Sequence, residues 1–160
     1  MSDKIGMFTG SFDPVTKGHL NLIERASKLF DTLYIGLFYN HNKKGFFSLA
    51  EKEQMLREAV VHLPNVRVVV SCDELAVDVA LKYGVTSFVR GLRNASDFDY
   101  EAKLQFYNKE LAPKIETIFL LSDPEHQYLT SSAIRELLTF GKDVRAYVPQ
   151  SVIKKIRKNL

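Results

Sequence analysis

The sequence has a single cysteine, Cys72, among its 160 residues. One cysteine excludes an internal disulfide, argues against a zinc site built on cysteines and suits a reducing compartment, so we expect a cytoplasmic location. No apolar run approaches the length of a membrane span, and the N-terminus lacks the basic and apolar segments of a signal peptide. We therefore expect neither a membrane-bound nor a secreted protein.

A large excess of one charge is also lacking, because the formal net charge is only +3 at pH 7. This charge is too small to predict a nucleic-acid partner, although its sign suits a small anionic ligand. The basic residues near the C-terminus fit a solvated helix face better than a nucleic-acid patch. With 46% hydrophobic and 26% charged residues, the chain is expected to form one globular domain over 1–160 with a sizeable core.

Several common catalytic motifs are absent as well. The sequence contains no Gly-x-Ser-x-Gly elbow, no Gly-x-x-x-x-Gly-Lys-Ser/Thr loop, no His-Glu-x-x-His pair and no Gly-x-Gly-x-x-Gly turn. A clear nucleophile and a carboxylate cage for a metal are therefore not expected, and a dehydrogenase is disfavoured. The candidate residues that remain are cations and hydrogen-bond donors, which suit phosphate transfer by alignment and charge neutralisation.

The stretch from Met7 to Leu20 has the strongest local pattern. Apolar residues lead to Gly10, a polar turn follows, and helical spacing begins near Leu20, which predicts a strand, a turn and a helix start. Thr16 fits the N-cap, so His19 falls in the first turn, where backbone N–H groups and the helix dipole favour an anion. A capping turn with a surface histidine is the alternative, but the whole stretch favours a nucleotide phosphate site.

Strand-like and helix-like segments alternate along the rest of the chain. The expected strands cover 33–39, 66–70, 87–89 and 115–121, and the expected helices cover 48–61, 75–83, 96–111, 131–141 and 151–158. Ser48, Ser96 with Asp97, and Ser131 with Ser132 are the expected caps of three of these helices. Alternation of this kind implies βαβ units and hence an α/β fold, a five-stranded parallel sheet with helices on both faces.

Candidate site residues follow several of the expected strands, namely Gly10 and Ser11, then Lys43, then Arg90 and Arg93. Ligands of open α/β sheets bind outside the carboxyl ends of the strands, so we expect these residues to meet there.

Each candidate also has a simpler explanation. Lys43 alone fits a solvated loop, and Arg90 and Arg93 alone fit surface ion pairs with Asp97 and Glu101. The serines at 131 and 132 alone fit a helix cap. Because these residues occur together at successive strand ends, a shared ligand-binding site is favoured over these separate explanations.

The Thr-Lys-Gly-His segment at 16–19 matches the Thr/His-x-Gly-His signature of the nucleotidyltransferase superfamily. Further motifs are Gly-Ser-Phe-Asp-Pro at 10–14, Lys-Lys at 43–44, Arg-Gly-Leu-Arg at 90–93, Asp-Phe-Asp-Tyr-Glu at 97–101, and Leu-Thr-Ser-Ser at 129–132 followed by Arg-Glu at 135–136. In this order and spacing, over nearly the whole chain, they resemble the bacterial phosphopantetheine adenylyltransferases.

The resemblance implies a Rossmann-like domain that transfers the adenylyl group of ATP to 4′-phosphopantetheine, giving dephospho-coenzyme A and pyrophosphate. It also implies that Mg²⁺ arrives with ATP, that the protein is a homohexamer, and that coenzyme A inhibits it. His19 and Lys43 are the implied catalytic residues. The implied ATP-binding residues are Gly10, Ser11, Phe12, His19, Gly91, Leu92, Arg93, Glu101, Thr130, Ser131 and Ser132, and the implied acceptor-binding residues are Ser11, Lys43, Leu75, Ala76 and Arg90.

The sequence departs from the family pattern at two places, and two alternative functions remain open. Ser11 occupies a position where the family commonly has threonine, which keeps the hydroxyl, and 123–128 diverges. A sister enzyme that adenylates nicotinate mononucleotide or transfers CMP is the first rival, and the Arg-Gly-Leu-Arg motif argues against it. A regulatory nucleotide-binding module without turnover is the second, and it would not need His19 together with Lys43.

Overall fold

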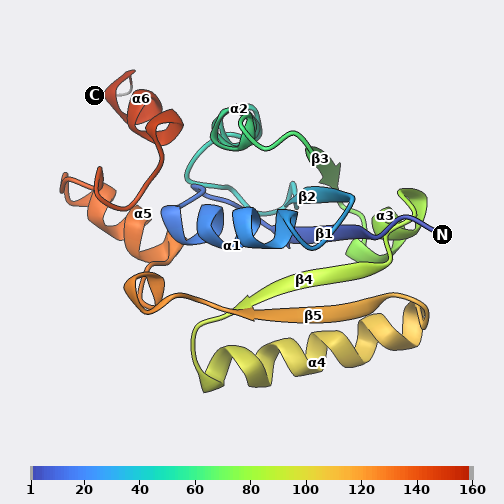
Figure 1. The fold of residues 1–160 in the computed structure, drawn as a ribbon. Helices are drawn as coiled ribbons and strands as arrows, with labels where there is room; N and C mark the ends of the chain where they lie inside the picture. The colour runs from blue at the N-terminus through green and yellow to red at the C-terminus, as the bar shows by residue number, and fades with distance from the viewer. Residues whose placement is uncertain (1, 159–160) are drawn as a thin grey trace.

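The computed structural model describes residues 2–158. They contain a parallel sheet of five strands in the order β3-β2-β1-β4-β5, flanked by helices, which confirms the expected α/β fold (Figure 1). The strands are β1 (Ile5–Gly10), β2 (Thr32–Tyr39), β3 (Val66–Cys72), β4 (Ser87–Leu92) and β5 (Glu116–Leu121). The helices are α1 (Lys17–Ser27), α2 (Leu49–Val60), α3 (Ala76–Lys82), α4 (Ala95–Leu111), α5 (Ser131–Thr139) and α6 (Gln150–Lys158), with a 3₁₀ turn at Pro124–His126.

The order of the strands creates a crevice at the centre of the sheet. The chain builds outward from β1 through β2 to β3, then crosses back to place β4 and β5 on the other side of β1. Loops after β1 and β4 therefore leave in opposite directions at the carboxyl edge. In open parallel sheets this reversal point is where ligands bind.

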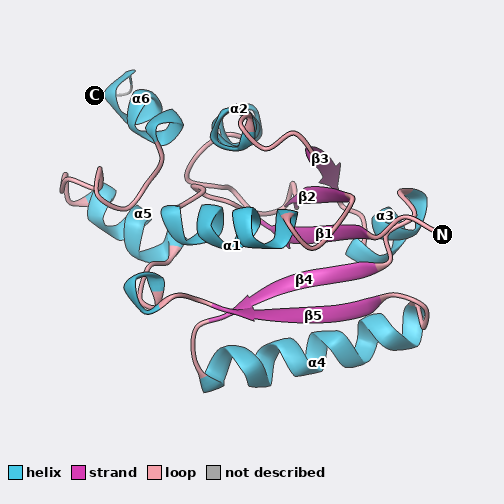
Figure 2. Cartoon of the chain, viewed as in Figure 1, coloured by secondary structure: helices cyan, strands magenta, loops and turns pink. Residues whose placement is uncertain are grey.

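Alternation along the strands produces a core on each face of the sheet. Phe8 of β1 packs in the cluster that contains Ile23 of α1 and Leu56 of α2, whereas Met7 packs with Val77 of α3 and Phe88 of β4. Figure 2 shows α4 lying along β4 and β5. The helices α6 and α2 lie beside each other, on the side of the molecule away from α4. Successive residues of a strand point to opposite faces, so both faces need helices. Within residues 2–158, no helix has both the length and the apolar character that crossing a bilayer requires.

The strand β4 is longer than the sequence predicts. It was expected to end at Val89, but the ladder with β5 continues and pairs Arg90 with Phe119 and Leu92 with Leu121. Arg90 therefore lies inside a strand instead of following one. The neighbouring strand supplies hydrogen bonds that the local sequence does not reveal.

Two of the expected helix caps are wrong by one to three residues. The N-cap of α4 is Asn94, whose Oδ1 accepts from the N–H of Asp97 at 2.9 Å. The N-cap of α5 is Thr130, whose Oγ1 accepts from the N–H of Ala133 at 3.0 Å. In both places the earlier residue is extended and its side chain reaches the third helical N–H, which is the geometry that a cap requires. Thr16 and Ser48 cap α1 and α2 as expected.

Candidate active site

A cleft of about 390 Å³ opens at the carboxyl edge of the sheet, between β1 and β4. Most of the residues expected to bind ATP line it, namely Gly10, Ser11, Phe12, His19, Gly91, Arg93, Glu101, Thr130 and Ser131. Leu92 and Ser132 do not. Leu92 is buried in the protein, and the exposed Ser132 accepts a hydrogen bond from Arg135 at 3.1 Å. The reversal point of the sheet thus gathers residues from four distant segments.

His19 is held by a reciprocal cap at the start of α1. The N–H of His19 donates to Thr16 Oγ1 at 3.2 Å, and the N–H of Thr16 donates to His19 Nδ1 at 3.0 Å. A backbone N–H can only donate, so Nδ1 carries a lone pair and the proton of the neutral ring is on Nε2. Phe12 packs edge-on against the ring with centroids 5.1 Å apart, which fixes its orientation.

The surroundings of His19 keep the ring neutral. Its pKa is lowered from 6.5 to about 4, mainly because burial disfavours the charged ring and also because the positive charges of Arg93 and Arg90 oppose a further one. At neutral pH, His19 can therefore present an uncharged Nε2–H donor beside two guanidinium groups. A glycine in β4 lets α1, the helix that carries His19, pack close to this strand. A Cβ at Gly91 would lie only 2.4 Å from Leu22 of α1.

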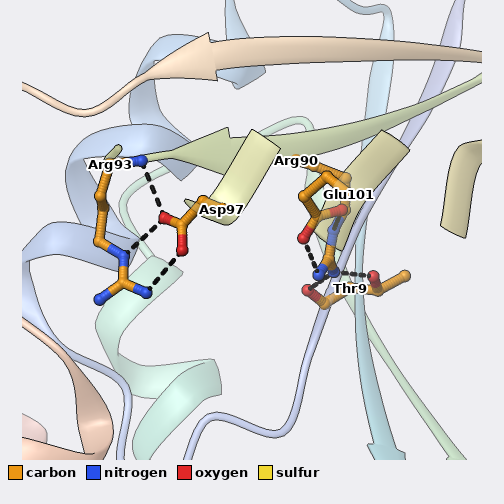
Figure 3. Close-up of polar contacts among 5 residues, drawn as sticks. All are labelled: Thr9, Arg90, Arg93, Asp97 and Glu101. Carbon is orange, nitrogen blue, oxygen red and sulfur yellow. Dashed lines mark hydrogen bonds and ion pairs between the residues drawn. The ribbon is translucent and has the colours of Figure 1, made fainter. Parts of the chain in front are cut away.

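Arg90 is locked to the sheet and to α4 (Figure 3). Its Nη1 donates to the carbonyl of Thr9 at 2.9 Å and to Thr9 Oγ1 at 2.6 Å. Its Nε and Nη2 donate to the two oxygens of the buried Glu101 at 2.9 and 2.7 Å. Four of its five N–H bonds are used in these contacts, which leaves one N–H on Nη2 for an incoming anion.

Arg93 is more available. Its Nε and Nη2 donate to Asp97 at 2.9 and 3.1 Å, so three of its five N–H bonds remain for a ligand (Figure 3). Burial alone would raise the pKa of Asp97, but the hydrogen bonds from Arg93 outweigh it and hold that pKa below its ordinary value. The ion pairs considered from the sequence are thus present, as Arg90 with Glu101 and Arg93 with Asp97. Both guanidinium groups still line the cleft.

The start of α5 closes the cleft opposite β4. Thr130 and Ser131 line it, and the hydroxyl of Ser131 donates to the carbonyl of Pro14 at 2.8 Å, which joins α5 to the turn after β1. The N–H groups of the first turn of a helix have no partner within the helix. Together with the helix dipole, they make this end of α5 suitable for a phosphate.

Lys43 lines a second hollow that adjoins the cleft. This hollow also receives Lys44, Lys52 and Arg135, and Ser11 lines both spaces. Lys43 and Arg90 were both expected to bind the acceptor, and the structure places them in adjacent hollows. Lys43 is exposed on a loop, so its side chain can reach toward Ser11 when a ligand is present.

A third hollow extends from Arg90 in another direction. Leu75 and Ala76, both expected to contact the acceptor, line it together with Arg90 and Glu101. Arg90 thus faces the cleft on one side and a partly apolar groove on the other. A ligand with a phosphate and an uncharged arm matches this arrangement.

Sequence reasoning missed several residues that shape the site. Thr9 holds Arg90, and its polar side chain in an otherwise apolar strand was the available signal. Asp13 was read only as a turn residue, yet its buried carboxylate accepts the N–H groups of Phe46 at 2.8 Å and Phe47 at 2.9 Å, which anchors the loop carrying Lys43. His126, in the divergent stretch, lines the cleft. Nothing in the sequence singles it out.

Comparisons with known proteins identify relatives of this chain. The model of the cytidylyltransferase-like family matches residues 7–137. The phosphopantetheine adenylyltransferases of Streptococcus sanguinis and Streptococcus gordonii are each 60% identical to this chain over 158 residues, covering 99% of it and 96% of their own length. That of Streptococcus pneumoniae strain CGSP14 is 59% identical over 157 residues, covering 98% and 97%.

Among solved structures, a putative nicotinate-nucleotide adenylyltransferase from Vibrio parahaemolyticus superposes with a TM-score of 0.71. The alignment covers 97% of this chain and 99% of that one at 21% identity. This likeness supports the fold and does not extend to the substrate.

Proposed function

This chain belongs to the cytidylyltransferase-like family and, within it, to the phosphopantetheine adenylyltransferases, and we propose that it reversibly transfers the adenylyl group of ATP to 4′-phosphopantetheine. The products are dephospho-coenzyme A and pyrophosphate, an activity that serves coenzyme A biosynthesis in the cytoplasm. The observation that carries this proposal is a neutral Nε2–H donor of His19 beside Arg90 and Arg93 in one cleft, in a chain 60% identical to named enzymes.

The reaction needs alignment more than it needs covalent help. A phosphate oxygen of 4′-phosphopantetheine attacks the α-phosphorus of ATP, and the bond from that phosphorus to the oxygen bridging the β-phosphate breaks. Pyrophosphate leaves with the electron pair of that bond. The attacking phosphate is already ionised near neutral pH, so no general base is required, and stabilisation of the developing charge dominates.

Each part of the cleft has a role in this scheme. His19 donates from Nε2 to the α-phosphate, Arg93 and the N-terminus of α5 hold the β- and γ-phosphates, and the loop at Gly10 and Ser11 lies against the triphosphate. This assignment rests on the available N–H groups of Arg93 and of the first turn of α5.

The acceptor binds on the other side of Arg90. Its phosphate meets the remaining N–H of Arg90 and the mobile ammonium of Lys43, and its uncharged arm lies along Leu75 and Ala76. Coenzyme A has the same arm, so we propose that it competes with 4′-phosphopantetheine for this groove. Inhibition that rising 4′-phosphopantetheine does not relieve would contradict this competition.

A pyrophosphate assay distinguishes the candidate functions. The purified chain with ATP should release pyrophosphate when 4′-phosphopantetheine is added and not when nicotinate mononucleotide replaces it. Release only with nicotinate mononucleotide would assign the chain to the sister activity. ATP binding without release for any acceptor would indicate a regulatory module.

We expect Mg²⁺ to be required and to enter on the phosphates of ATP. The two carboxylates among the described residues that line the cleft, Asp97 and Glu101, are already paired with Arg93 and Arg90 and do not form a cage. Mg²⁺ commonly binds through substrate phosphates and water in such sites. Excess EDTA should therefore abolish pyrophosphate release, and added Mg²⁺ should restore it. Undiminished turnover in EDTA would contradict this expectation.

We also propose that the chain assembles as a homohexamer, with α4 in an interface. Glu101 is the only buried residue described in this helix of 17 residues, while Phe98, Phe106 and Tyr107 are each at least half exposed. Several large apolar side chains exposed on one helix are a common feature of contact surfaces. Sedimentation should give a hexameric mass, and Tyr107→Glu should reduce it. A monomeric mass for the parent chain would overturn the proposal.

A further inference from the structure

Three side chains that can bind a metal ion meet at the carboxyl ends of β2 and β3, outside the cleft. His41 lies in the loop that follows β2, Cys72 ends β3, and Asp73 comes next. One donor atom from each lies within 4.8 Å of the other two, and all three residues are exposed. In the part of the chain that the structure describes, they form the one cluster of this kind.

The main chain orients the carboxylate in this cluster. The N–H of Asp73 donates to the carbonyl of Tyr39 at 3.0 Å, which fastens the residue to the end of β2. Asp73 Oδ1 accepts the backbone N–H of His41 at 3.3 Å. The other oxygen, Oδ2, contacts both His41 Nδ1 and Cys72 Sγ, the latter at 3.4 Å. A nitrogen, a sulfur and an oxygen donor thus face one another, while Oδ1 is held by the backbone.

We propose that His41 Nδ1, Cys72 Sγ and Asp73 Oδ2 bind a divalent transition metal of the zinc type, with water as the fourth ligand. Zinc bonds to nitrogen, sulfur and oxygen place tetrahedral ligand atoms ~3.5 Å apart, so exposed side chains within 4.8 Å need only a modest adjustment. A thiolate and an imidazole select zinc over Mg²⁺. The thiol of Cys72 releases its proton to solvent when the ion binds.

This site differs from the Mg²⁺ that we propose for catalysis, and it does not depend on the proposed function. A single cysteine suffices because the tertiary structure adds a histidine from another strand end. His41 lies two residues before Lys43. A bound ion would therefore tie the loop that carries Lys43 to the end of β3.

The test is a titration of the full-length, metal-free protein with ZnCl₂, followed by calorimetry and by thermal unfolding. We expect about one ion per chain, a higher unfolding midpoint with zinc, and no displacement by excess Mg²⁺. Cobalt in place of zinc should give a thiolate-to-metal charge-transfer band. Cys72→Ser and His41→Gln should each weaken zinc binding at least about tenfold and remove its effect on the midpoint.

His62→Gln is the matched control, because His62 is an exposed histidine paired with a carboxylate, Glu24, at 3.0 Å. Zinc binding should be unchanged in this variant. The metal-free unfolding midpoints of all variants should match the parent, since the replaced side chains are exposed. Zinc binding that survives Cys72→Ser, or a cobalt form without the thiolate band, would overturn the proposal whatever the pyrophosphate assay shows.

Discussion

Replacing His19 with alanine is expected to lower kcat by about two to three orders of magnitude while ATP binding changes little. The neutral ring holds Nε2–H in the cleft with Arg90 and Arg93, where we propose that the charge of the transition state develops. A donor that acts mainly on developing charge affects turnover more than ground-state binding. The measurements are steady-state pyrophosphate release and calorimetric titration with ATP. A variant with a normal kcat and only a raised KM would contradict the role.

The alanine variant also loses the acceptor that satisfies the N–H of Thr16, so a second variant must separate catalysis from capping. His19→Gln places a glutamine three residues after a threonine cap, which is the usual capping-box pair. It should therefore keep the stability of α1 but lose the rigid imidazole donor. If His19→Gln recovers both stability and turnover, the loss in alanine came from the helix cap.

The pH dependence provides an independent check on His19. Its pKa is about 4 in the folded protein and 6.5 in a reference chain, so the unfolded state binds a proton that the folded state rejects between these values. The stability that this difference contributes is present above pH 6.5 and is lost as the pH falls toward 4. Chemical denaturation at pH 7 and pH 5 should show this loss for the parent and a smaller one for His19→Ala. Equal losses would contradict the lowered pKa.

Replacing Arg90 with alanine should weaken 4′-phosphopantetheine binding by about 10- to 100-fold, as expected for a lost charge-assisted hydrogen bond, and weaken ATP binding much less. Arg90 lines both the cleft and the groove of Leu75 and Ala76, where we propose that the acceptor phosphate and its arm bind. The change also leaves the buried Glu101 unpaired, which should cost about 3–5 kcal/mol of folding free energy. Calorimetry with each ligand and chemical denaturation measure the two effects.

Two further variants keep this prediction testable if the alanine variant unfolds. Arg90→Lys retains a positive charge beside Glu101 but loses the planar fork, so it should fold and still bind the acceptor less tightly than the parent. Arg93→Ala removes the neighbouring guanidinium, whose partner Asp97 is more exposed than Glu101, and should weaken ATP more than the acceptor. Equal losses of both ligands in Arg90→Lys would refute the assignment.

The fold was predictable because local signals and global topology agree. Apolar strands that alternate with helices permit little besides a parallel sheet covered on both faces. The boundary of β4 was not predictable in this way, since Gly91 is a weak strand former and Arg90 and Gly91 are paired only because β5 lies beside them. The caps at Asn94 and Thr130 were missed because several polar residues adjoin each helix start, and the backbone conformation selects among them.

The sequence by itself determined the chemistry that the site can perform. It contains a histidine in the first turn of α1, two arginines near the end of β4 and a lysine loop after β2, and it lacks any obvious nucleophile. These residue types favour a site that binds phosphates and stabilises their charge. Strand alternation also predicts that they gather at one edge of the sheet.

Only the tertiary structure decided the protonation state and the hydrogen-bond partners of these side chains. Burial and nearby cations make His19 neutral, and the packing of α4 against β4 joins Arg90 to Glu101, eleven residues away. The same folding places Lys43 in a separate hollow and brings His41 to Cys72 and Asp73, a metal-ligand set that the sequence, with its single cysteine, argued against. A pKa, a hydrogen-bond partner and a ligand set depend on distances between segments remote in sequence, and those distances exist only once the sheet has formed.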